Sequence, residues 1–399
     1  MNHHEPQNSL KPATIAVRAG NRRTQFSETS EALFLNSGYV YESAEAAEAA
    51  FNGEIDRFVY SRYGNPTTAM FEERLRAMEG AEACTATASG MGAVFTSLAA
   101  LLKPGDRLVA ARSLFGSCFV VCNEILPSWG VETVFVDGDD IVQWQNALQH
   151  PAAVVFFETP SNPMQTLVDI AAVSALAHEV GATVVVDNGF LPVGMQHGLQ
   201  HGADVIVHSA TKTIDGQGRV MGGAILGSKD FIEGPVRNMV RHTGPTMAPF
   251  NAWVLAKGLE SSQVRTDFSS RSAAKIADYL SVEDAVEWVR YPYHPSHPQY
   301  DLAQRQMSNG GTVITLSLQE STESGKKTAF RLLNRLQLID ISNNFGDAKS
   351  LISHPSTTTH RAMGAEARSK IGLNDSVVRL SVGLEDADDL IADLRSALA

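Results

Sequence analysis

The chain has 399 residues, of which 44% are hydrophobic and 19% charged, so it is long enough for two packed domains. Its formal net charge of −12 at pH 7 argues against sequence-independent binding to nucleic acid or to an anionic membrane surface. No stretch reaches the roughly 18 uninterrupted apolar residues of a membrane span, and the polar N-terminus lacks the apolar core of a signal peptide.

The first part of the chain, residues 1–64, shows no strand periodicity. It contains one predicted helix at residues 44–51, with Ser43 as the N-cap. We expect the rest of this part to form an extended arm that contacts a neighbouring subunit.

Residues 65–258 alternate helical patterns with short apolar runs, which indicates an α/β domain. Fully apolar short strands between helices are typical of a mainly parallel sheet that is covered on both faces. Residues 259–399 mix helices with alternating strands at 310–318 and 377–385. That pattern predicts a smaller α+β domain whose strands have one solvent-facing side.

Chemically useful residues follow the apolar runs of the large domain. Ligands bind outside the carboxyl ends of strands in such sheets, so these positions are candidate site residues. Taken singly, each has a plain structural explanation, since an aspartate here often caps a helix and a lysine is usually solvated. The residues in question are Ser89, Gly90 and Met91, then Asn162, then Asp187, and finally Ser209, Thr211 and Lys212.

Together these residues favour one cofactor. Free amides at a helix start near Gly90, with hydroxyls from Ser209 and Thr211, suit a phosphate. Asp187 suits a protonated heterocyclic nitrogen, and a desolvated Lys212 can form an imine with an aldehyde. Phosphate, pyridinium and aldehyde describe pyridoxal 5'-phosphate (PLP). We interpret the glycines that follow Lys212 as room for this cofactor.

Other motifs carry less weight. The run SATK (209–212) matches the S-x-x-K pattern of β-lactamases, but their other motifs are absent. The run GMGAVF (90–95) lacks the third glycine of a dinucleotide fingerprint. The histidines of HPSHP (294–298) and HPSTTTH (354–360), and the cysteines Cys84, Cys118 and Cys122, lack metal-ligand spacing, so no metal site is predicted. We expect reduced thiols in a cytoplasmic protein.

The motifs resemble those of one family in order along the chain. They are YSRYGNPT (60–67), SGM (89–91), ETPSNP (158–163), VDN (186–188), SATK (209–212), VMGG (220–223) and RLSVGLE (379–385). The chain is therefore similar to the Cys/Met-metabolism family of PLP enzymes. This resemblance implies a fold-type I large domain, like that of aspartate aminotransferase, and a homotetramer of two tight dimers with shared active sites.

The resemblance also implies roles for single residues. Lys212 would bind PLP covalently and act in catalysis, and Tyr60 would be a second catalytic residue. Tyr60 and Arg62 would reach the phosphate of the neighbouring subunit's cofactor. The other implied cofactor contacts are Ser89, Gly90, Met91, Phe115, Asn162, Asp187, Ser209 and Thr211. The implied substrate contacts are Asn344, Thr359 and Arg379, where Arg379 would bind the α-carboxylate.

Two departures from the family pattern narrow the expected reaction. Phe115 replaces a tyrosine that usually stacks on the cofactor, and Asn343 stands where enzymes of cystathionine chemistry tend to have glutamate. With the runs at 112–118 and 341–360, they resemble O-succinylhomoserine sulfhydrylases, which implies γ-replacement of succinate by sulfide to form homocysteine. Arg112 is a candidate for the distal succinyl carboxylate.

Three alternatives stay open. The chain could use cysteine, as cystathionine γ-synthases do, or carry out a γ-elimination like that of methionine γ-lyases. A non-enzymatic interaction protein on a PLP fold is poorly supported, since the cofactor positions keep their chemistry. The residues also leave open whether succinate or acetate is the leaving group.

Overall fold

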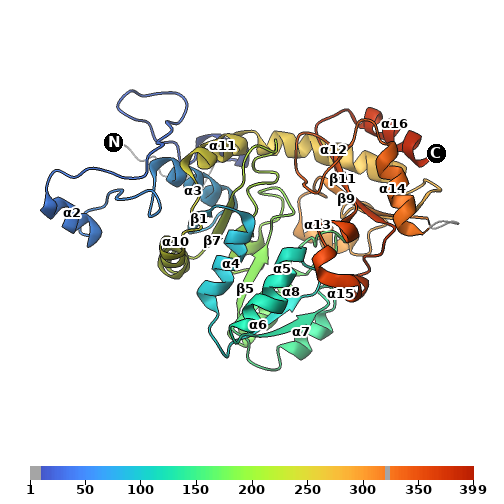
Figure 1. Ribbon diagram of the computed structural model, residues 1–399, viewed down its shortest axis with the longest axis horizontal. Helices are drawn as coiled ribbons and strands as arrows, with labels where there is room; N and C mark the ends of the chain where they lie inside the picture. Colours follow the sequence, from blue (N-terminus) through green and yellow to red (C-terminus); the bar gives the residue numbers. More distant parts are fainter. Residues whose placement is uncertain (1–9, 320–323) are drawn as a thin grey trace.

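The computed structural model describes residues 10–319 and 324–399, which form an arm, a large sheet and a small sheet (Figure 1). The large sheet has seven strands and the small sheet five. The α/β class with a mainly parallel large sheet and a smaller α+β part is confirmed. The domain boundaries after residues 64 and 258 stay predictions.

The large sheet is built from the apolar runs of the sequence. Its strands are β1 (Ala83–Thr87), β2 (Arg107–Ala111), β3 (Glu132–Val136), β4 (Val154–Glu158), β5 (Thr183–Asp187), β6 (Val205–His208) and β7 (Gly223–Gly227), in the order β1-β7-β6-β5-β4-β2-β3. The five neighbouring strands β3, β2, β4, β5 and β6 run parallel. Strand β7 is antiparallel to both of its neighbours, β1 and β6. The carboxyl ends of β4, β5 and β6 therefore meet at one edge.

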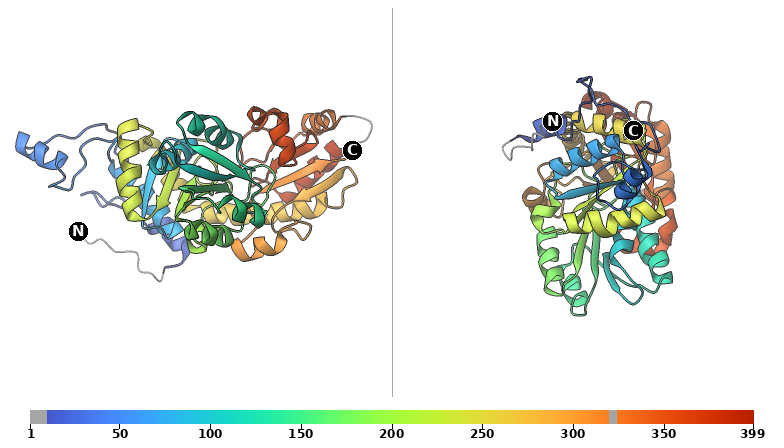
Figure 2. Two further views of the ribbon diagram at one scale, coloured as in Figure 1. Left: turned by 90° about the horizontal axis from the view of Figure 1, so that it is seen from below. Right: turned by 90° about the vertical axis from the view of Figure 1, so that its left-hand side faces the viewer.

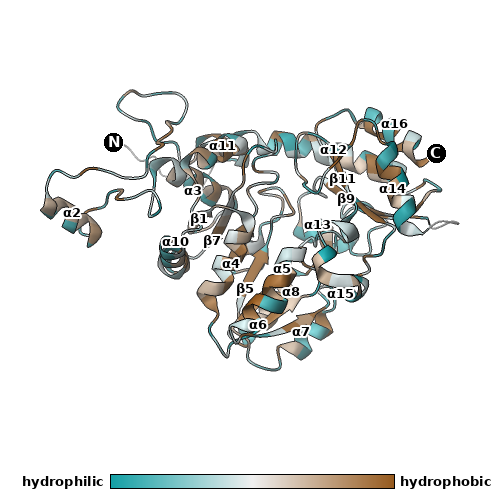
Figure 3. Cartoon of the chain, viewed as in Figure 1, coloured by the Kyte–Doolittle hydropathy of each residue, from teal (hydrophilic) through white to brown (hydrophobic). Residues whose placement is uncertain are grey.

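Helices cover both faces of this sheet, as Figure 2 shows from the side. One face packs on α3 (Pro66–Glu79), α7 (Ile141–Ala147), α8 (Ile170–Glu179) and α11 (Pro249–Glu260). The other packs on α4 (Gly90–Leu101), α5 (Gly116–Val120), α6 (Leu126–Ser128), α10 (Arg237–Thr243) and the π-helical turns Val121–Ile125 and Ile232–Val236. Strand β5 and helix α5 are largely hydrophobic in Figure 3. Alternate side chains of the central strands enter opposite cores, which is why β4, β5 and β6 are largely apolar and buried.

The small sheet has the order β10-β11-β12-β9-β8. Its strands are β8 (Val286–Arg290), β9 (Val313–Leu318), β10 (Asp340–Ile341), β11 (Leu351–Ser353) and β12 (Val377–Ser381). The core on one face contains side chains of α12 (Ser262–Leu280), α14 (Gly325–Arg335) and α16 (Ala387–Leu398). Two further helices are α13 (Tyr300–Gln306) and α15 (Gly364–Lys370).

The prediction that β9 and β12 have a solvent-facing side is wrong. Every residue of both strands is buried. Two of their polar side chains face the loop that follows β4 instead of water, because the Thr315 hydroxyl donates to the Pro163 carbonyl at 2.5 Å and Arg379 donates to Asn162 at 2.8 Å. Polar and apolar residues do alternate in β9 and β12, but the large domain packs over the polar side of these strands.

The segment that carries α2 (Ala44–Phe51) extends away from the body (Figure 2), whereas α1 (Pro12–Arg18), a helix that was not predicted, packs on α3 and α11. The predicted cap of α2 is present, because Ser43 Oγ accepts from the Ala46 N–H at 3.1 Å. The arm is anchored by Glu31, which forms ion pairs with Arg74 and Lys257. In the described ranges, no helix is long and apolar enough to cross a membrane.

Candidate active site

Lys212 lies in the turn that follows β6. Its N–H bonds back to the Ser209 carbonyl at 3.2 Å, so the chain reverses at the carboxyl edge of the sheet. Nζ donates to Asn344 Oδ1 and lies 4.7 Å from the centre of the Phe345 ring. Burial, with the Arg379 charge, lowers the pKa of Lys212 from 10.5 to about 8. About a tenth of such an amine is uncharged at pH 7, and this fraction can act as nucleophile or base.

Two buried carboxylates stand side by side at the ends of β4 and β5. Glu158 and Asp187 are paired across the strands and are 4% and 8% exposed. Burial raises the pKa of both groups, and the Asp187 charge raises that of Glu158 further. Asp187 accepts from the Gly189 N–H at 2.9 Å and from the Cys118 thiol at 3.7 Å. Over the described ranges, no cationic side chain hydrogen bonds to Asp187, so a bound cation would stabilise its charged form.

The start of α4 lies against the turn that carries Ser209. A Cβ added at Gly90 would be 2.8 Å from Ser209 Oγ, so only glycine allows this approach. Ser89 caps the helix by accepting from the Gly92 N–H at 3.0 Å. The N–H groups of Gly90 and Met91 belong to the first turn, where an α-helix leaves its amides unpaired. These amides and the Ser209 hydroxyl form a cradle suited to an anion.

The expectation that the glycines behind Lys212 leave room for a cofactor is wrong for Gly223. A Cβ there would lie 2.6 Å from Thr87 Oγ1 and would also collide with the Ser89 backbone. The glycine instead lets β7 approach the start of α4. The Thr211 hydroxyl is bonded to the Gly222 backbone at 3.1 and 3.2 Å, so this residue also fastens the turn to β7.

Arg379 and Asn162 meet between the two sheets. Arg379 is 1% exposed, and its Nη1 donates to Asn162 Oδ1 at 2.8 Å. Its Nη2 donates to the carbonyls of Asn343 and Asn344 at 3.0 and 3.1 Å, whereas Nε is buried and has no hydrogen-bond partner among residues 10–319 and 324–399. Burial lowers the pKa of Arg379 to about 10. An unpaired guanidinium N–H in a buried place is suited to a carboxylate ligand.

Phe115 and Thr359 both contact the buried side chain of His360. The Phe115 N–H donates to Glu158 Oε2 at 2.8 Å, which ties the start of α5 to the end of β4. The Phe115 ring meets the His360 ring edge-on, with centroids 6.2 Å apart. Thr359 contacts the same histidine through its hydroxyl at 2.9 Å.

The structure does not bring Tyr60 and Arg62 to Lys212 within one chain. Tyr60 lies on the arm with 40% exposure, and Arg62 stacks near the rings of Tyr60 and Tyr63. Arg62 also donates to the Arg241 carbonyl. Their implied role at a neighbouring subunit's cofactor stays a prediction.

Arg112 is engaged elsewhere. Its Nε donates to Asp137 Oδ1 at 2.9 Å, and its Nη2 donates to the Phe135 carbonyl at 3.2 Å. Binding a succinyl carboxylate would require Arg112 to leave Asp137, and this role also stays a prediction.

Four residues that contact Asp187, Phe115, Lys212 or Asn162 were not among the predicted site residues. They are Cys118, Glu158, Phe345 and His360. Glu158 had a readable signal, because it ends its apolar run just as Asp187 does. The other three are placed by tertiary packing, and nothing in their local sequence distinguishes them from core residues.

The residues present fit PLP. The cradle at Gly90 and Ser209 suits the phosphate, Asp187 suits the ring nitrogen, and Lys212 suits the aldehyde. Asn162 Oδ1 is occupied by Arg379, so its Nδ2 remains to donate to the phenolic oxygen of the ring.

Known proteins match the chain over nearly its whole length. Residues 13–399 match the family model of Cys/Met metabolism PLP-dependent enzymes. The O-succinylhomoserine sulfhydrylase of Mycobacterium tuberculosis is 64% identical over 390 residues, which are 98% of this chain and 96% of that protein. The O-succinylhomoserine sulfhydrylase of Pseudomonas aeruginosa is 43% identical over 97% of this chain and 94% of its own length.

A solved structure shows the same fold with the cofactor attached. It is a putative O-acetylhomoserine (thiol)-lyase from Campylobacter jejuni, with N'-pyridoxyl-lysine-5'-monophosphate at one position. Its TM-score is 0.92 at 28% identity, covering 98% of this chain and 100% of that one. The chain thus belongs to the Cys/Met metabolism family of PLP-dependent enzymes.

Proposed function

We propose that this enzyme converts O-succinyl-L-homoserine and hydrogen sulfide to L-homocysteine and succinate. The observation that carries the proposal is the 64% identity, over 98% of the chain, to a protein named O-succinylhomoserine sulfhydrylase. The reaction is a γ-replacement, in which the bond from Cγ to the ester oxygen breaks and a bond from Cγ to sulfur forms. The geometry around Lys212 and Arg379 supports the proton transfers and the binding of the α-carboxylate in this reaction.

Arg379 is proposed to orient the substrate through its α-carboxylate. Its Nη groups are held by Asn162, Asn343 and Asn344, so the guanidinium plane is fixed before substrate arrives. The unpaired Nε leaves a donor for the carboxylate. A fixed donor adds specificity at little entropic cost.

Lys212 is proposed to move the protons at the substrate Cα and Cβ. An amine with a pKa of about 8 can both accept and return a proton near neutral pH. Asp187 is proposed to hold the proton at the ring nitrogen, because its carboxylate is buried with no cationic hydrogen-bond partner among the described residues. PLP, when bound, supplies an electron sink for the negative charge that each deprotonation leaves. Phe115 has no hydroxyl, so it can stack on the ring without taking part in proton transfer.

Asn343 supports sulfide over cysteine as the nucleophile. A glutamate at this exposed position would offer an anionic partner to the ammonium group of an incoming cysteine, whereas asparagine carries no charge. Hydrosulfide has no ammonium group, so asparagine in place of glutamate removes no attractive contact with it.

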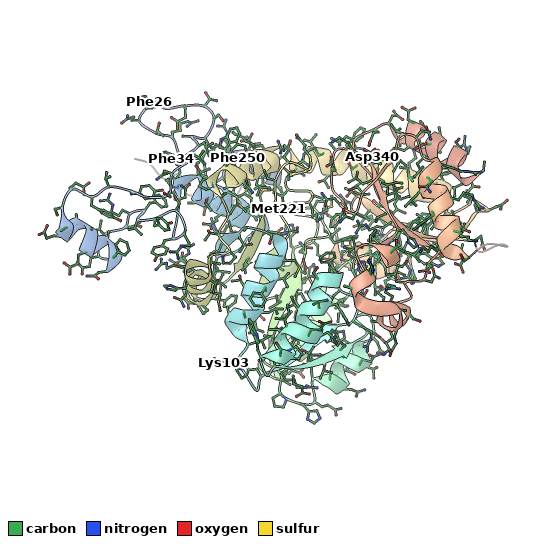
Figure 4. All side chains as sticks on the ribbon, in the orientation of Figure 1. Phe26, Phe34, Lys103, Met221, Phe250 and Asp340 are labelled. Atoms are coloured by element: carbon green, nitrogen blue, oxygen red, sulfur yellow. The ribbon has the colours of Figure 1, made fainter. Side chains whose placement is uncertain are left out.

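A homotetramer of two tight dimers is proposed as the working assembly. Large apolar side chains are exposed on the arm and on the body beside it, including Phe26 at 80%, Met221 at 62% and Phe250 at 47% (Figure 4). Exposed apolar residues of this size favour contact with another chain. A cytoplasmic location stays a prediction, in line with three buried free cysteines.

A product assay tests the function. O-succinyl- and O-acetylhomoserine are each offered with sulfide and with cysteine, and the elimination products are measured in parallel with L-methionine as substrate. We expect the highest kcat/KM for O-succinylhomoserine with sulfide. Higher kcat/KM with cysteine would favour a cystathionine γ-synthase, and dominant cleavage of methionine would favour a γ-lyase; either result overturns the proposal.

A further inference from the structure

His360, the last residue of the run HPSTTTH, is fully buried beside the cluster around Lys212. Its Nε2 lies 2.9 Å from the Asn162 carbonyl and its Nδ1 lies 2.9 Å from Thr359 Oγ1. Its ring meets Phe115 edge-on. One side chain therefore touches three residues, Asn162, Phe115 and Thr359, to which the family resemblance assigns a cofactor or substrate contact.

The contacts determine which ring nitrogen of His360 carries the hydrogen. Burial, with the Arg379 charge, lowers the pKa of His360 to about 4, so the ring is neutral near pH 7. A carbonyl oxygen can only accept, so Nε2 carries the hydrogen that is donated to Asn162. Nδ1 then has a lone pair and accepts from the Thr359 hydroxyl. Because the Thr359 hydroxyl donates its hydrogen to His360, it can only accept a hydrogen bond from any other group.

The backbone around His360 is held in place by close packing. A Cβ added at Gly116 would collide with the Thr359 carbonyl, so the 359–360 segment lies directly on the start of α5. Phe115 immediately precedes that helix. Asn162 is thus held from the small-sheet side by two residues, with His360 at its carbonyl and Arg379 at its side-chain oxygen.

We propose that His360 is a positioning residue of the active site, which holds the backbone of Asn162 against the small sheet and orients the Thr359 hydroxyl as a hydrogen-bond acceptor toward substrate. It acts through Asn162 and Thr359 and not on the reacting atoms. The proposal rests on the proposed function for the assignment of Asn162 to the cofactor and of Thr359 to the substrate.

Two substitutions separate the two contacts. His360→Gln keeps an N–H at the place of Nε2 and removes the acceptor for Thr359. His360→Asn keeps an acceptor at the place of Nδ1 and removes the donor to Asn162. His297→Gln is the matched control, because His297 is 4% exposed, has a pKa lowered by burial to about 4, and places Nε2 3.0 Å from the carbonyl of Gln165.

The first measurement is PLP binding to the apo-enzyme, followed by the absorbance spectrum of the bound cofactor. We expect His360→Asn to weaken PLP binding roughly tenfold, the ratio typical of one lost hydrogen bond, and to shift the absorbance maximum. His360→Gln and His297→Gln should stay within about threefold of the wild type on the same scale. Wild-type affinity and spectrum in a folded His360→Asn would overturn the role at Asn162.

The second measurement is a double-mutant cycle on kcat/KM with Thr359→Val. We expect His360→Gln to lower kcat/KM roughly tenfold in the wild type and little in the Thr359→Val background, since the contact is already gone there. Additive effects would overturn the orientation of Thr359. Should His360→Asn fail to fold, this cycle still decides the role at Thr359, and additive effects there would overturn the proposal. A chain that does not use O-succinylhomoserine would fail the product assay, yet its PLP affinity and spectrum would still report on His360.

Discussion

Arg379 Nη1 donates a hydrogen bond to Asn162 Oδ1 over 2.8 Å, from the central strand of the small sheet to the loop after β4 of the large sheet. The bond joins a residue assigned to the substrate with one assigned to the cofactor. Because the Asn162 side-chain oxygen is occupied, the orientation of its amide is determined, and its N–H groups face the remaining side. Under the proposed roles of Arg379 and Asn162, this pair of side chains would couple substrate binding to cofactor binding.

Arg379→Lys should lower kcat/KM by on the order of 100-fold, equivalent to about 2.7 kcal/mol at 25 °C. A lysine keeps the charge but cannot donate to Asn162, two backbone carbonyls and a carboxylate at once. Steady-state kinetics with O-succinylhomoserine measure the loss, and the cofactor spectrum should change as well. A variant with an unchanged spectrum and only a modest rise in KM would contradict the coupling.

Lys212 should make the stability of the apo-enzyme depend on pH. Its pKa falls from 10.5 to about 8 on folding, so between these values the unfolded chain binds more protons than the folded one. Stability contributed by this residue therefore rises as pH increases through the window. Against Lys212→Met, the wild type should gain on the order of 3 kcal/mol between pH 7 and pH 11. Denaturant unfolding measures both proteins, and a constant difference would refute a buried, depressed lysine.

Cys118→Ala should move the acid limb of the kcat/KM profile to higher pH. The thiol donates to Asp187 Oδ2 at 3.7 Å, and this contact favours the charged carboxylate. Without it the Asp187 pKa rises, and the carboxylate is protonated at a higher pH. Cys122→Ala is the control, because that thiol is fully buried one helical turn later and its pKa is raised by burial alone. Equal profiles for both variants would exclude an effect through Asp187.

Mixed oligomers test whether active sites are shared. Chains with Arg62→Ala and chains with Lys212→Ala are each expected to be inactive. If Arg62 serves the neighbouring site, a mixed dimer contains one intact site, and random mixing should restore about a quarter of wild-type activity. Each variant, dissociated and reassembled alone, is the control. Absence of recovery in dimers shown to be mixed would mean that each chain completes its own site.

Glu31→Ala should destabilise the fold by on the order of 3 kcal/mol, because it removes the buried one of the two anionic partners of Arg74 and leaves only the partly exposed Glu260 at 3.3 Å. Glu42→Ala is the matched control, since its pair with Arg57 is exposed and should cost about 0–1 kcal/mol. Burial opposes ionisation of Glu31, but hydrogen bonds from Lys257 and Arg74 outweigh it and lower its pKa from 4.5 to about 2. This contribution is therefore present above pH 4.5 and is lost as pH falls toward 2. Thermal and chemical unfolding of both variants measure the difference.

The sequence alone determined the fold class and the part of the site that lies at strand ends. Apolar runs with no polar alternation require a sheet buried on both faces, and such runs at 107–111, 131–136, 152–158, 182–187 and 203–209 place β2 to β6 within one or two residues. Parallel strands bring their carboxyl ends to one edge, and Asp187, Ser209 and Lys212 follow from that rule. These features depend on local pattern and on topology, which short stretches of sequence encode.

Only the tertiary structure decided what surrounds those residues. The alternation in β9 and β12 indicates one polar side, but whether that side meets water or another sheet depends on how the two parts pack. Arg379 faces Asn162, Cys118 faces Asp187 and His360 faces Phe115 because segments more than 65 residues apart along the chain come together. Such contacts leave no periodic signal, since each depends on the shape of both partners and not on the spacing within either one.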